Sequence, residues 1–419
     1  MKALWQIVKL ELLANFRSRS FYLLTAAVVL WMTALPAFVK SDGTSEGARQ
    51  ICIHYSLAGA FAMVLMALAG AAAGSLSRER AAKRLQLTAV RPVRFFTIAA
   101  GRYLALMLVG TMQITLAGGI LTLKSDMDLS RPCDHLLSPV LPSVWEEAET
   151  MYSVYMQDEE TPEEVRKMDK REVIRLLAAK APDHYQTVAT NETARWLFPD
   201  FVPSGAVKVQ LRFTNTYDTR EDVCGLFRLG CAEGVVSNIT QAVAKVPLAG
   251  MIDQVVGERV LEFANQGGGS LMLRPRRDIK LLVEADGFGW NLVRALLELT
   301  AILSVAIAFA IFLGAGLSRS VAVFTVVAFL VLALVSPAVV EESDEFASNK
   351  YDRIGIRLAR VAEKITRPAG SLAPLEKLAG DICVEKSEVA KTILLDFAVY
   401  PLVFIFLAAL AIPRKQDLA

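Results

Sequence analysis

Long apolar runs alternate with charged stretches along this chain, and the pattern predicts its architecture. Six apolar runs are long enough to cross a hydrocarbon core of about 30 Å, because a helix rises about 1.5 Å per residue. A buried core helix is a good explanation of one such run but a poor one of six. The pattern therefore predicts an α-helical polytopic membrane protein with six transmembrane helices. The predicted spans are Phe21–Val39, Tyr55–Ser75, Ile98–Leu123, Asn291–Leu313, Val321–Val340 and Ile393–Ile412.

Between the third and fourth spans, residues 124–290 contain no long apolar run, which predicts a separate water-soluble domain. Its first part, 124–200, is expected to be helical, since Trp145–Met156 and Thr161–Ala179 are rich in Glu, Lys and Arg. Its second part, 204–287, is expected to be β-sandwich-like. The domain is thus predicted to be an inserted α+β fold.

Alternation of apolar and polar positions predicts the strands of that second part. Val207–Phe213 places its valines, Leu211 and Phe213 on one face and Lys208, Gln210 and Arg212 on the other, which is typical of a half-buried strand. Glycine-rich turns separate the remaining candidates. These are Leu226–Leu229, Arg259–Phe263, Ser270–Leu273 and Ile279–Glu284.

The charges of the loops predict the orientation. On one side of the six spans, the loops and termini hold 13 basic and three acidic residues, whereas the opposite short loops hold 11 basic and 12 acidic residues. Positively charged loops are retained in the cytoplasm. We therefore expect both termini in the cytoplasm and residues 124–290 outside the membrane. The first set is 1–20, 76–97, 314–320 and 413–419, and the second set is 40–54 and 341–391.

Two further stretches have the pattern of helices that lie on a membrane surface. The first twenty residues place Trp5, Val8 and Leu12 on one face, with lysine and arginine on or near the polar side. A signal peptide is the competing interpretation, but the charged region is too long for one and no small-residue cleavage site follows. Within 341–391, an acidic start is followed by a basic amphipathic segment, whose apolar face is Ile354, Leu358, Val361 and Ile365.

The predicted organisation has three parts. Residues 1–123 comprise an interfacial helix and spans one to three, joined by the loop 76–97. Residues 124–290 form the extracytoplasmic domain. Residues 291–419 comprise spans four to six, with the amphipathic outer segment 341–391 before the last span.

The composition and the motifs of the chain limit the partners and the chemical activities that we expect. Hydrophobic residues make up 54% of the chain and the net charge is only +2, so nucleic acid is not an expected partner. The sequence contains no GxxxxGK[ST], HExxH, GxSxG or CxxC motif, and it suggests no pair of carboxylates within the membrane. We therefore expect no catalytic, cofactor-binding or metal-binding residues on this chain, and no enzymatic activity of its own.

Glycines and cysteines each leave two interpretations open. Gly70 and Gly74 form a GxxxG in the second span, which lets helix backbones approach closely, either within one subunit or at a dimer interface. Cys224 and Cys231 flank a short turn-like stretch. They could pair in an oxidising compartment, or they could be two small buried residues.

The loop between spans two and three is the most distinctive stretch. From Leu76 to Thr97 it has six basic residues against a single acid, Glu79. Ser77 can cap a helix that begins at Arg78, and Pro92 ends the run before the next span. The loop is therefore predicted to be a short polar helix at the cytoplasmic mouth of the bundle, positioned to receive force from a cytoplasmic partner.

This stretch resembles the coupling region of bacterial ABC-2 type transporter permeases, whose pattern is roughly R-E-x-x-x-G-T-L-x-x-L-x-x-x-P-V-x-R followed by G-K-Y-L. Lys83 and Arg84 replace the usual Gly-Thr and Arg102 replaces the lysine, so the chain is similar to a divergent member. The ends of the chain, KLELLANFRSRSFYLL and IPRKQDLA, also resemble the family. The matching residues are Arg78, Glu79, Leu85, Pro92, Val93, Gly101, Tyr103 and Leu104, with Arg94 one place early and Leu87 at a commonly apolar position.

The resemblance covers roughly 1–123 and 291–419 and implies a function. It implies a permease subunit, expected to be an exporter, in the bacterial inner membrane. A separate ABC ATPase subunit would bind and hydrolyse ATP, and a second permease copy or a paralogue would complete the pathway through the lipid bilayer. The implied coupling residues are Arg78, Glu79, Leu85, Leu87, Pro92, Arg94, Gly101 and Tyr103.

Two other functions stay open at this point. One is an ATP-driven machine that transmits force to the ectodomain and moves no substrate. The other is a membrane-anchored receptor, although an anchor needs one or two spans and no interfacial helix.

Overall fold

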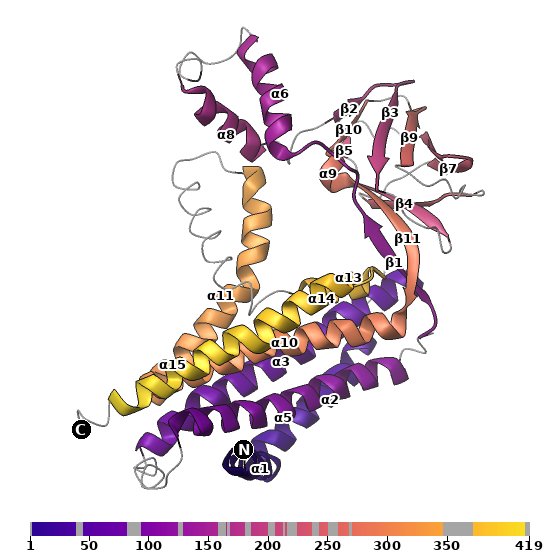
Figure 1. Cartoon of the computed structure of the whole chain (residues 1–419). Helices are drawn as coiled ribbons and strands as arrows, with labels where there is room; N and C mark the ends of the chain where they lie inside the picture. Colours follow the sequence, from indigo (N-terminus) through magenta and orange to yellow (C-terminus); the bar gives the residue numbers. More distant parts are fainter. Residues whose placement is uncertain are drawn as a thin grey trace. The chain divides into compact units, whose positions relative to one another are not determined.

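The computed structural model of the chain is mostly helical, with a β-rich region inserted between its helices (Figure 1). It divides into two compact units, residues 1–131 together with 287–419, and residues 132–286. The predicted domain 124–290 covers the second unit and a few residues on either side of it. The structure describes residues 2–38, 45–81, 94–124, 129–157, 165, 168–180, 186–199, 206–212, 214–215, 224–236, 243–249, 259–267, 270–346 and 372–414.

The first unit is a bundle of helices. Three central helices, α3 (Ser45–Ala81), α5 (Phe95–Lys124) and α10 (Phe288–Gly316), pack on one another. The remaining elements of this unit are α1 (Lys2–Phe16), α2 (Arg19–Phe38), α11 (Arg319–Phe346), α13 (Ala373–Ala379), α14 (Lys386–Thr392), η2 (Ile393–Val399) and α15 (Tyr400–Arg414).

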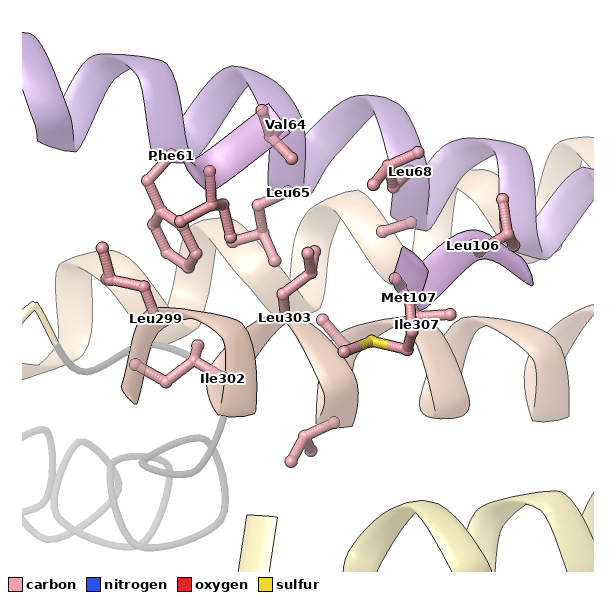
Figure 2. Close-up of a cluster of buried hydrophobic side chains, with 14 of the residues drawn as sticks. Phe61, Val64, Leu65, Leu68, Leu106, Met107, Leu299, Ile302, Leu303 and Ile307 are labelled. Carbon is pink, nitrogen blue, oxygen red and sulfur yellow. The ribbon is translucent and has the colours of Figure 1, made fainter. Parts of the chain in front are cut away.

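The core of the bundle lies where the three central helices meet, and Figure 2 shows its side chains. Phe61 and Leu65 of α3 lie beside Leu299 and Leu303 of α10. Gly110 of α5 allows Leu303 of α10 to approach α5 closely, because a Cβ at position 110 would lie 2.3 Å from Leu303 Cδ2. The missing side chain at this glycine thus lets α5 and α10 pack closely.

A second close approach joins α10 to α3. A Cβ at Gly314 would lie 2.4 Å from the carbonyl oxygen of Ala73, a backbone atom that cannot swing aside. Helices in a bilayer gain little from burying apolar surface against one another, so backbone approach of this kind is a main source of their association.

Five helices in the described part of the chain are long and apolar enough to cross a membrane: Arg19–Pro36, Arg49–Arg78, Phe95–Leu123, Phe288–Gly316 and Lys386–Ala411. They correspond to five of the six predicted spans. The other predicted span, Val321–Val340, lies on α11. Its apolar stretch Arg319–Ala333 is shorter than a span, and the side chains beyond it are outside the description. The count of six spans therefore stays a prediction.

The last helix changes its pitch. Ile393–Val399 is π-helical between the α-helical segments α14 and α15, and the Tyr400 N–H donates to the carbonyl of Leu395, five residues earlier. Pro401 supplies a physical reason, because proline donates no N–H and its ring crowds the carbonyl four residues before it.

The second unit contains three β-sheets. The strand orders are β1-β11-β4-β8, β2-β10-β5 and β3-β9-β6-β7. The strands are β1 (Pro132–Leu137), β2 (Gln186–Val188), β3 (Thr193–Phe198), β4 (Val207–Arg212), β5 (Thr214–Asn215), β6 (Gly225–Leu229), β7 (Ala232–Val236), β8 (Val243–Pro247), β9 (Arg259–Asn265), β10 (Leu271–Leu273) and β11 (Ile279–Gly287). Helices α6 (Val144–Gln157), α8 (Lys170–Lys180) and α9 (Pro275–Asp278) also belong to the described part of this unit.

All three sheets share one hydrophobic core. Phe198, Phe227 and Phe263 are fully buried in it, and the rings of Phe227 and Phe263 lie 4.6 Å apart. The strand predicted at Val207–Phe213 is confirmed as β4, where Val207, Val209 and Leu211 are buried. Strands are also present at the four other predicted places, as β6, β9, β10 and β11.

The prediction that 124–200 is helical is wrong in part. Helices α6 and α8 lie there, but so do the strands β1, β2 and β3. Strand β3 alternates exposed and buried positions, with Trp196 and Phe198 in the core, and it pairs along its length with β9. A six-residue strand between charged helices has a weak signal in sequence, and pairing with a strand more than 60 residues away decides its structure.

The capping of α6 follows from its sequence. The Ser143 N–H donates to the Glu146 carboxylate at 2.8 Å, and the Glu146 N–H donates to Ser143 Oγ at 3.2 Å. This reciprocal pair satisfies two donors at the start of the helix. The hydrogen bond from the Ser143 backbone stabilises the ionised carboxylate and lowers the pKa of Glu146.

The suggested pairing of Cys224 with Cys231 is wrong, because neither cysteine forms a disulfide. Strand β6 separates them, with Cys224 just before it and Cys231 in the turn after it. Seven residues of extended chain span roughly 23 Å, whereas a disulfide requires Cα atoms within about 7 Å. Cys133 and Cys383 are the disulfide-bonded cysteines.

Candidate functional site

The candidate site is the first turns of α5, where the resemblance to the coupling region ends. Three successive residues, Gly101, Arg102 and Tyr103, are all buried although they lie next to one another on one helix. Successive residues of an α-helix point about 100° apart. Their burial therefore means that α5 is covered on several sides at this level.

Gly101 of α5 allows α1 to pack closely against α5. A Cβ at Gly101 would lie 2.6 Å from Cγ2 and 3.0 Å from Cβ of Ile7, so only glycine accommodates α1 at this distance. Leu4 lies next to the same point, and Val8 is buried. The face of α1 that meets α5 is therefore Leu4, Ile7 and Val8, whereas Trp5, predicted on the apolar face, is exposed.

Arg102 adds an electrostatic contact to the same pair of helices. Its Nε lies 3.0 Å from a carboxylate oxygen of Glu11 on α1, and the side chain of Arg102 is only 5% exposed. A guanidinium buried to this extent requires a counter-charge, and removal of one partner from a buried pair is strongly destabilising. Helix α1 is thus held by shape at Gly101 and by charge at Arg102.

Tyr103 connects α5 to α10. Its hydroxyl is hydrogen-bonded to Ser304 Oγ, and both residues are buried. A hydrogen bond between two buried hydroxyls satisfies groups that would otherwise be costly to bury. One turn of α5 therefore contacts both α1 and α10, and we call these contacts of Gly101, Arg102 and Tyr103 the α5 junction.

The other predicted coupling residues lie before this junction. Arg78 is exposed in the last turn of α3, where its Nε donates to the carbonyl of Gly74 at 2.9 Å. A cation at a helix C-terminus is favoured by the helix dipole. Glu79 lies on the same helix, and Arg94 is exposed just before α5. Leu85, Leu87 and Pro92 lie outside the described residues.

The two glycines of the GxxxG differ in their surroundings. A Cβ at Gly74 would lie 3.6 Å from Nε of both Arg78 and Arg319, so Gly74 faces the start of α11. At Gly70, no atom of the described residues lies within 4 Å of the Cβ position. Close packing within this subunit therefore uses Gly314 against Ala73, and the interpretation of Gly70 as part of a dimer interface stays a prediction.

Two acids that the sequence analysis did not assign to a site lie on helical segments that pack against each other. Glu298 of α10 is buried, and Asp396 lies on the π-helical segment η2, which packs against α10. The expectation that no carboxylates pair within the spans stays a prediction. The signal that could have indicated them is the presence of an acid in each of two apolar runs, one of which also contains Pro401. Arg294 of α10 donates from Nη1 to the carbonyl of Val384 at 3.3 Å.

The α5 junction predicts opposite effects for two glycines of the same helix. Alanine forms helix better than glycine by roughly 1 kcal/mol, so Gly119→Ala should leave stability unchanged or raise it, since nothing described lies within 4 Å of its Cβ position. Gly101→Ala must displace Ile7 and should cost about 1–3 kcal/mol. Thermal unfolding of the two variants in detergent measures the difference. A Gly101→Ala protein that unfolds at or above the temperature of Gly119→Ala would contradict the docking of α1.

Comparison with known proteins finds no relative of this chain. No protein-family model, no curated protein and no solved structure matches the chain. The functional assignment therefore depends on the residues and contacts described above.

Proposed function

We propose that the chain is the permease subunit of an ATP-driven ABC-2 type transporter, an exporter of the bacterial inner membrane. The observation that carries the proposal is the α5 junction. The segment that resembles a coupling region leads directly into Gly101, Arg102 and Tyr103, and these residues tie α1 and α10 to the helix that follows the segment.

A coupling segment must transmit force to the helices that line a pathway. A displacement of the segment between α3 and α5 acts on both helices, since it is continuous with each. Through Arg102 and Tyr103 the displacement also acts on α1 and α10. Packed helices move as rigid bodies rather than deform, so a push of this kind becomes a rearrangement of the bundle.

The proposal requires partners. ATP is bound and hydrolysed by a separate ABC ATPase subunit in the cytoplasm. A second copy or a paralogue completes the pathway, and Gly70, whose Cβ position has no described atom within 4 Å, is available for that contact. Both termini lie in the cytoplasm, six spans cross the bilayer, and residues 124–290 lie outside as a β-sandwich-like domain with helices.

A second candidate is transmission of force to the ectodomain without transport. One observation favours it: strand β11 ends at Gly287 and helix α10 begins at Phe288, so these two elements follow each other directly along the chain. A membrane-anchored receptor is the weaker alternative, since an anchor does not require contacts that tie three helices together, as the α5 junction does.

The coupling role predicts a loss of activity at the end of α3. In a complex of the chain with its ATPase subunit in nanodiscs, Arg78→Ala and Glu79→Ala should each lower membrane-subunit-dependent ATP hydrolysis by about tenfold, the loss of one charged hydrogen bond. Arg171→Ala and Glu149→Ala, which remove exposed charges from α8 and α6, serve as matched controls. Full activity in the Arg78 and Glu79 variants would show that the segment is only a solvated connector.

The proposed orientation predicts the pattern of labelling from outside the cell. Single cysteines placed in 130–280 should react with an impermeant maleimide, and cysteines placed in 80–92 should react only after the membrane is permeabilised. The positive charge of the loop 76–97 is the physical reason. Labelling of 80–92 in intact cells would overturn the orientation and with it the proposed contact to a cytoplasmic ATPase.

A further inference from the structure

One sheet of the second unit carries a row of alternating charges on its outer face. The sheet has the strand order β3-β9-β6-β7, and its inner face is buried in the core. On the outer face, Glu262 lies opposite Arg195 on one neighbouring strand and opposite Arg228 on the other. Arg228 in turn lies opposite Glu233. The charges therefore alternate in sign across four strands, and we call Arg195, Glu262, Arg228 and Glu233 the charge ladder.

Ion pairs within the sheet hold the charge ladder in place. Arg195 Nε lies 2.9 Å from a carboxylate oxygen of Glu262, and Arg228 Nη2 lies 2.7 Å from one of Glu233. The side chain of Arg195 is still 70% exposed, and those of Arg228 and Glu233 are about half exposed. A guanidinium has five N–H donors and a carboxylate about four acceptor positions. Each group can therefore bind a further partner from outside the sheet.

Apolar side chains lie next to the charge ladder on both sides. On one side Leu197 lies opposite Val260, and both are exposed. On the other side Leu226 lies between Ala264 and Val235 in one row, and Val235 is 69% exposed. Neighbouring apolar residues that are exposed on one face are typical of a protein interaction site.

The order of the charges makes this face complementary to itself. When two copies pack face to face about a two-fold axis parallel to the strands, β3 of one copy lies over β7 of the other. Arg195 then faces Glu233 of the second copy, and Glu262 faces Arg228 of the second copy, so that every charge meets its opposite. A two-fold axis along the charge ladder would instead place Arg195 on Arg195, and such contacts between like charges are strongly unfavourable.

We propose that the outer face of β3, β9, β6 and β7 binds the same face of a second copy of the chain, about a two-fold axis parallel to the strands. This arrangement keeps the strands of the two sheets aligned, as in most pairs of sheets that pack face to face. It also brings Ala264 of one copy opposite Leu226 of the other. The apolar row beside the charge ladder therefore packs on its own equivalent, as an isologous interface requires.

The size of the face limits where this contact can form. Four strands about 4.8 Å apart, with about five residues of 3.4 Å each, cover roughly 300 Å². A stable interface buries about 800 Å² on each partner, so the face pairs only when two chains are already confined to one membrane. The contact rests on that part of the proposed function in which the permease pairs with a second copy rather than a paralogue. It requires no ATPase subunit.

Cross-linking tests the orientation of the two copies. The full chain, with its free cysteines Cys52, Cys224 and Cys231 changed to serine, is placed in phosphatidylcholine liposomes and treated with a short bis-maleimide. Thr193 of β3 and Val235 of β7 are exposed and lie at opposite ends of the apolar row. In a chain with both Thr193→Cys and Val235→Cys, each new thiol should face the other type in the second copy. Covalent dimers should therefore form.

Two controls accompany this variant. Thr193→Cys or Val235→Cys alone should yield little covalent dimer, since equivalent positions of the two copies lie three strand spacings apart, about 14 Å along the sheet. Thr193→Cys with Leu197→Cys places both thiols on β3. These thiols meet only when the two-fold axis runs along the charge ladder, so this matched pair should also fail to cross-link.

Charge reversals in the Thr193→Cys, Val235→Cys chain separate contacts between copies from ion pairs within the sheet. Arg195→Glu or Glu233→Arg alone creates two contacts between like charges across the axis, and each should lower the cross-linked fraction at least about tenfold. The two reversals together restore opposite charges between the copies, but they leave like charges beside Glu262 and Arg228 within each sheet. Cross-linking should therefore return in the doubly reversed chain, whereas a role confined to the sheet predicts further damage.

Several outcomes would overturn the contact. These are no cross-linking of the Thr193→Cys, Val235→Cys chain, equal cross-linking of the Thr193→Cys, Leu197→Cys control, or no recovery in the doubly reversed chain when its thermal unfolding shows that it is folded. Light scattering of the chain in detergent distinguishes this failure from that of the proposed function. A dimer that does not cross-link contradicts the contact alone, and a monomer contradicts the second permease copy as well.

Discussion

The absence of a side chain at Gly101 allows α1 to lie against α5, and the α5 junction depends on that contact. Ile7 occupies the space that a Cβ would take. Once α1 is this close, Arg102 on the next position of α5 comes within 3.0 Å of Glu11 and can be buried with a counter-charge. Tyr103 then points away from α1 and bonds Ser304 of α10. Three residues in a row thus bind two different helices to a third.

Glycine-mediated approach recurs through the bundle. Gly110 admits Leu303 of α10 to α5, and Gly314 admits α3 to α10. In a bilayer the lipid tails are as apolar as the helix surfaces, so helices associate through such tight packing rather than through burial of apolar area. Tight packing also makes the bundle stiff. A stiff bundle is what a permease would need to convert a local push into a movement of whole helices, and the same stiffness would serve a machine that transmits force to its ectodomain.

The sequence predicted the elements whose signal is local. Apolar length identified the long helices, and alternation identified β4, because each of its core residues is separated from the next by a polar one. Strand β3 was missed because its partner β9 is distant in sequence. In the candidate site, Gly101 and Tyr103 were found through the resemblance, but their contacts with Ile7 and Ser304 join positions that are about 90 and 200 residues apart.

The docking of α1 on α5 is tested most directly by a disulfide between Ile7→Cys and Gly101→Cys. The Cβ positions lie 3.0 Å apart, close to the separation of about 3.8 Å found in disulfides. In a background where Cys52, Cys224 and Cys231 are serine, mild oxidation should protect both new thiols from a maleimide-polyethylene glycol gel shift. Lys9→Cys with Gly101→Cys should stay labelled, because Lys9 is exposed and points to the opposite side of α1. Labelling of the Ile7→Cys and Gly101→Cys pair after oxidation would contradict the α5 junction.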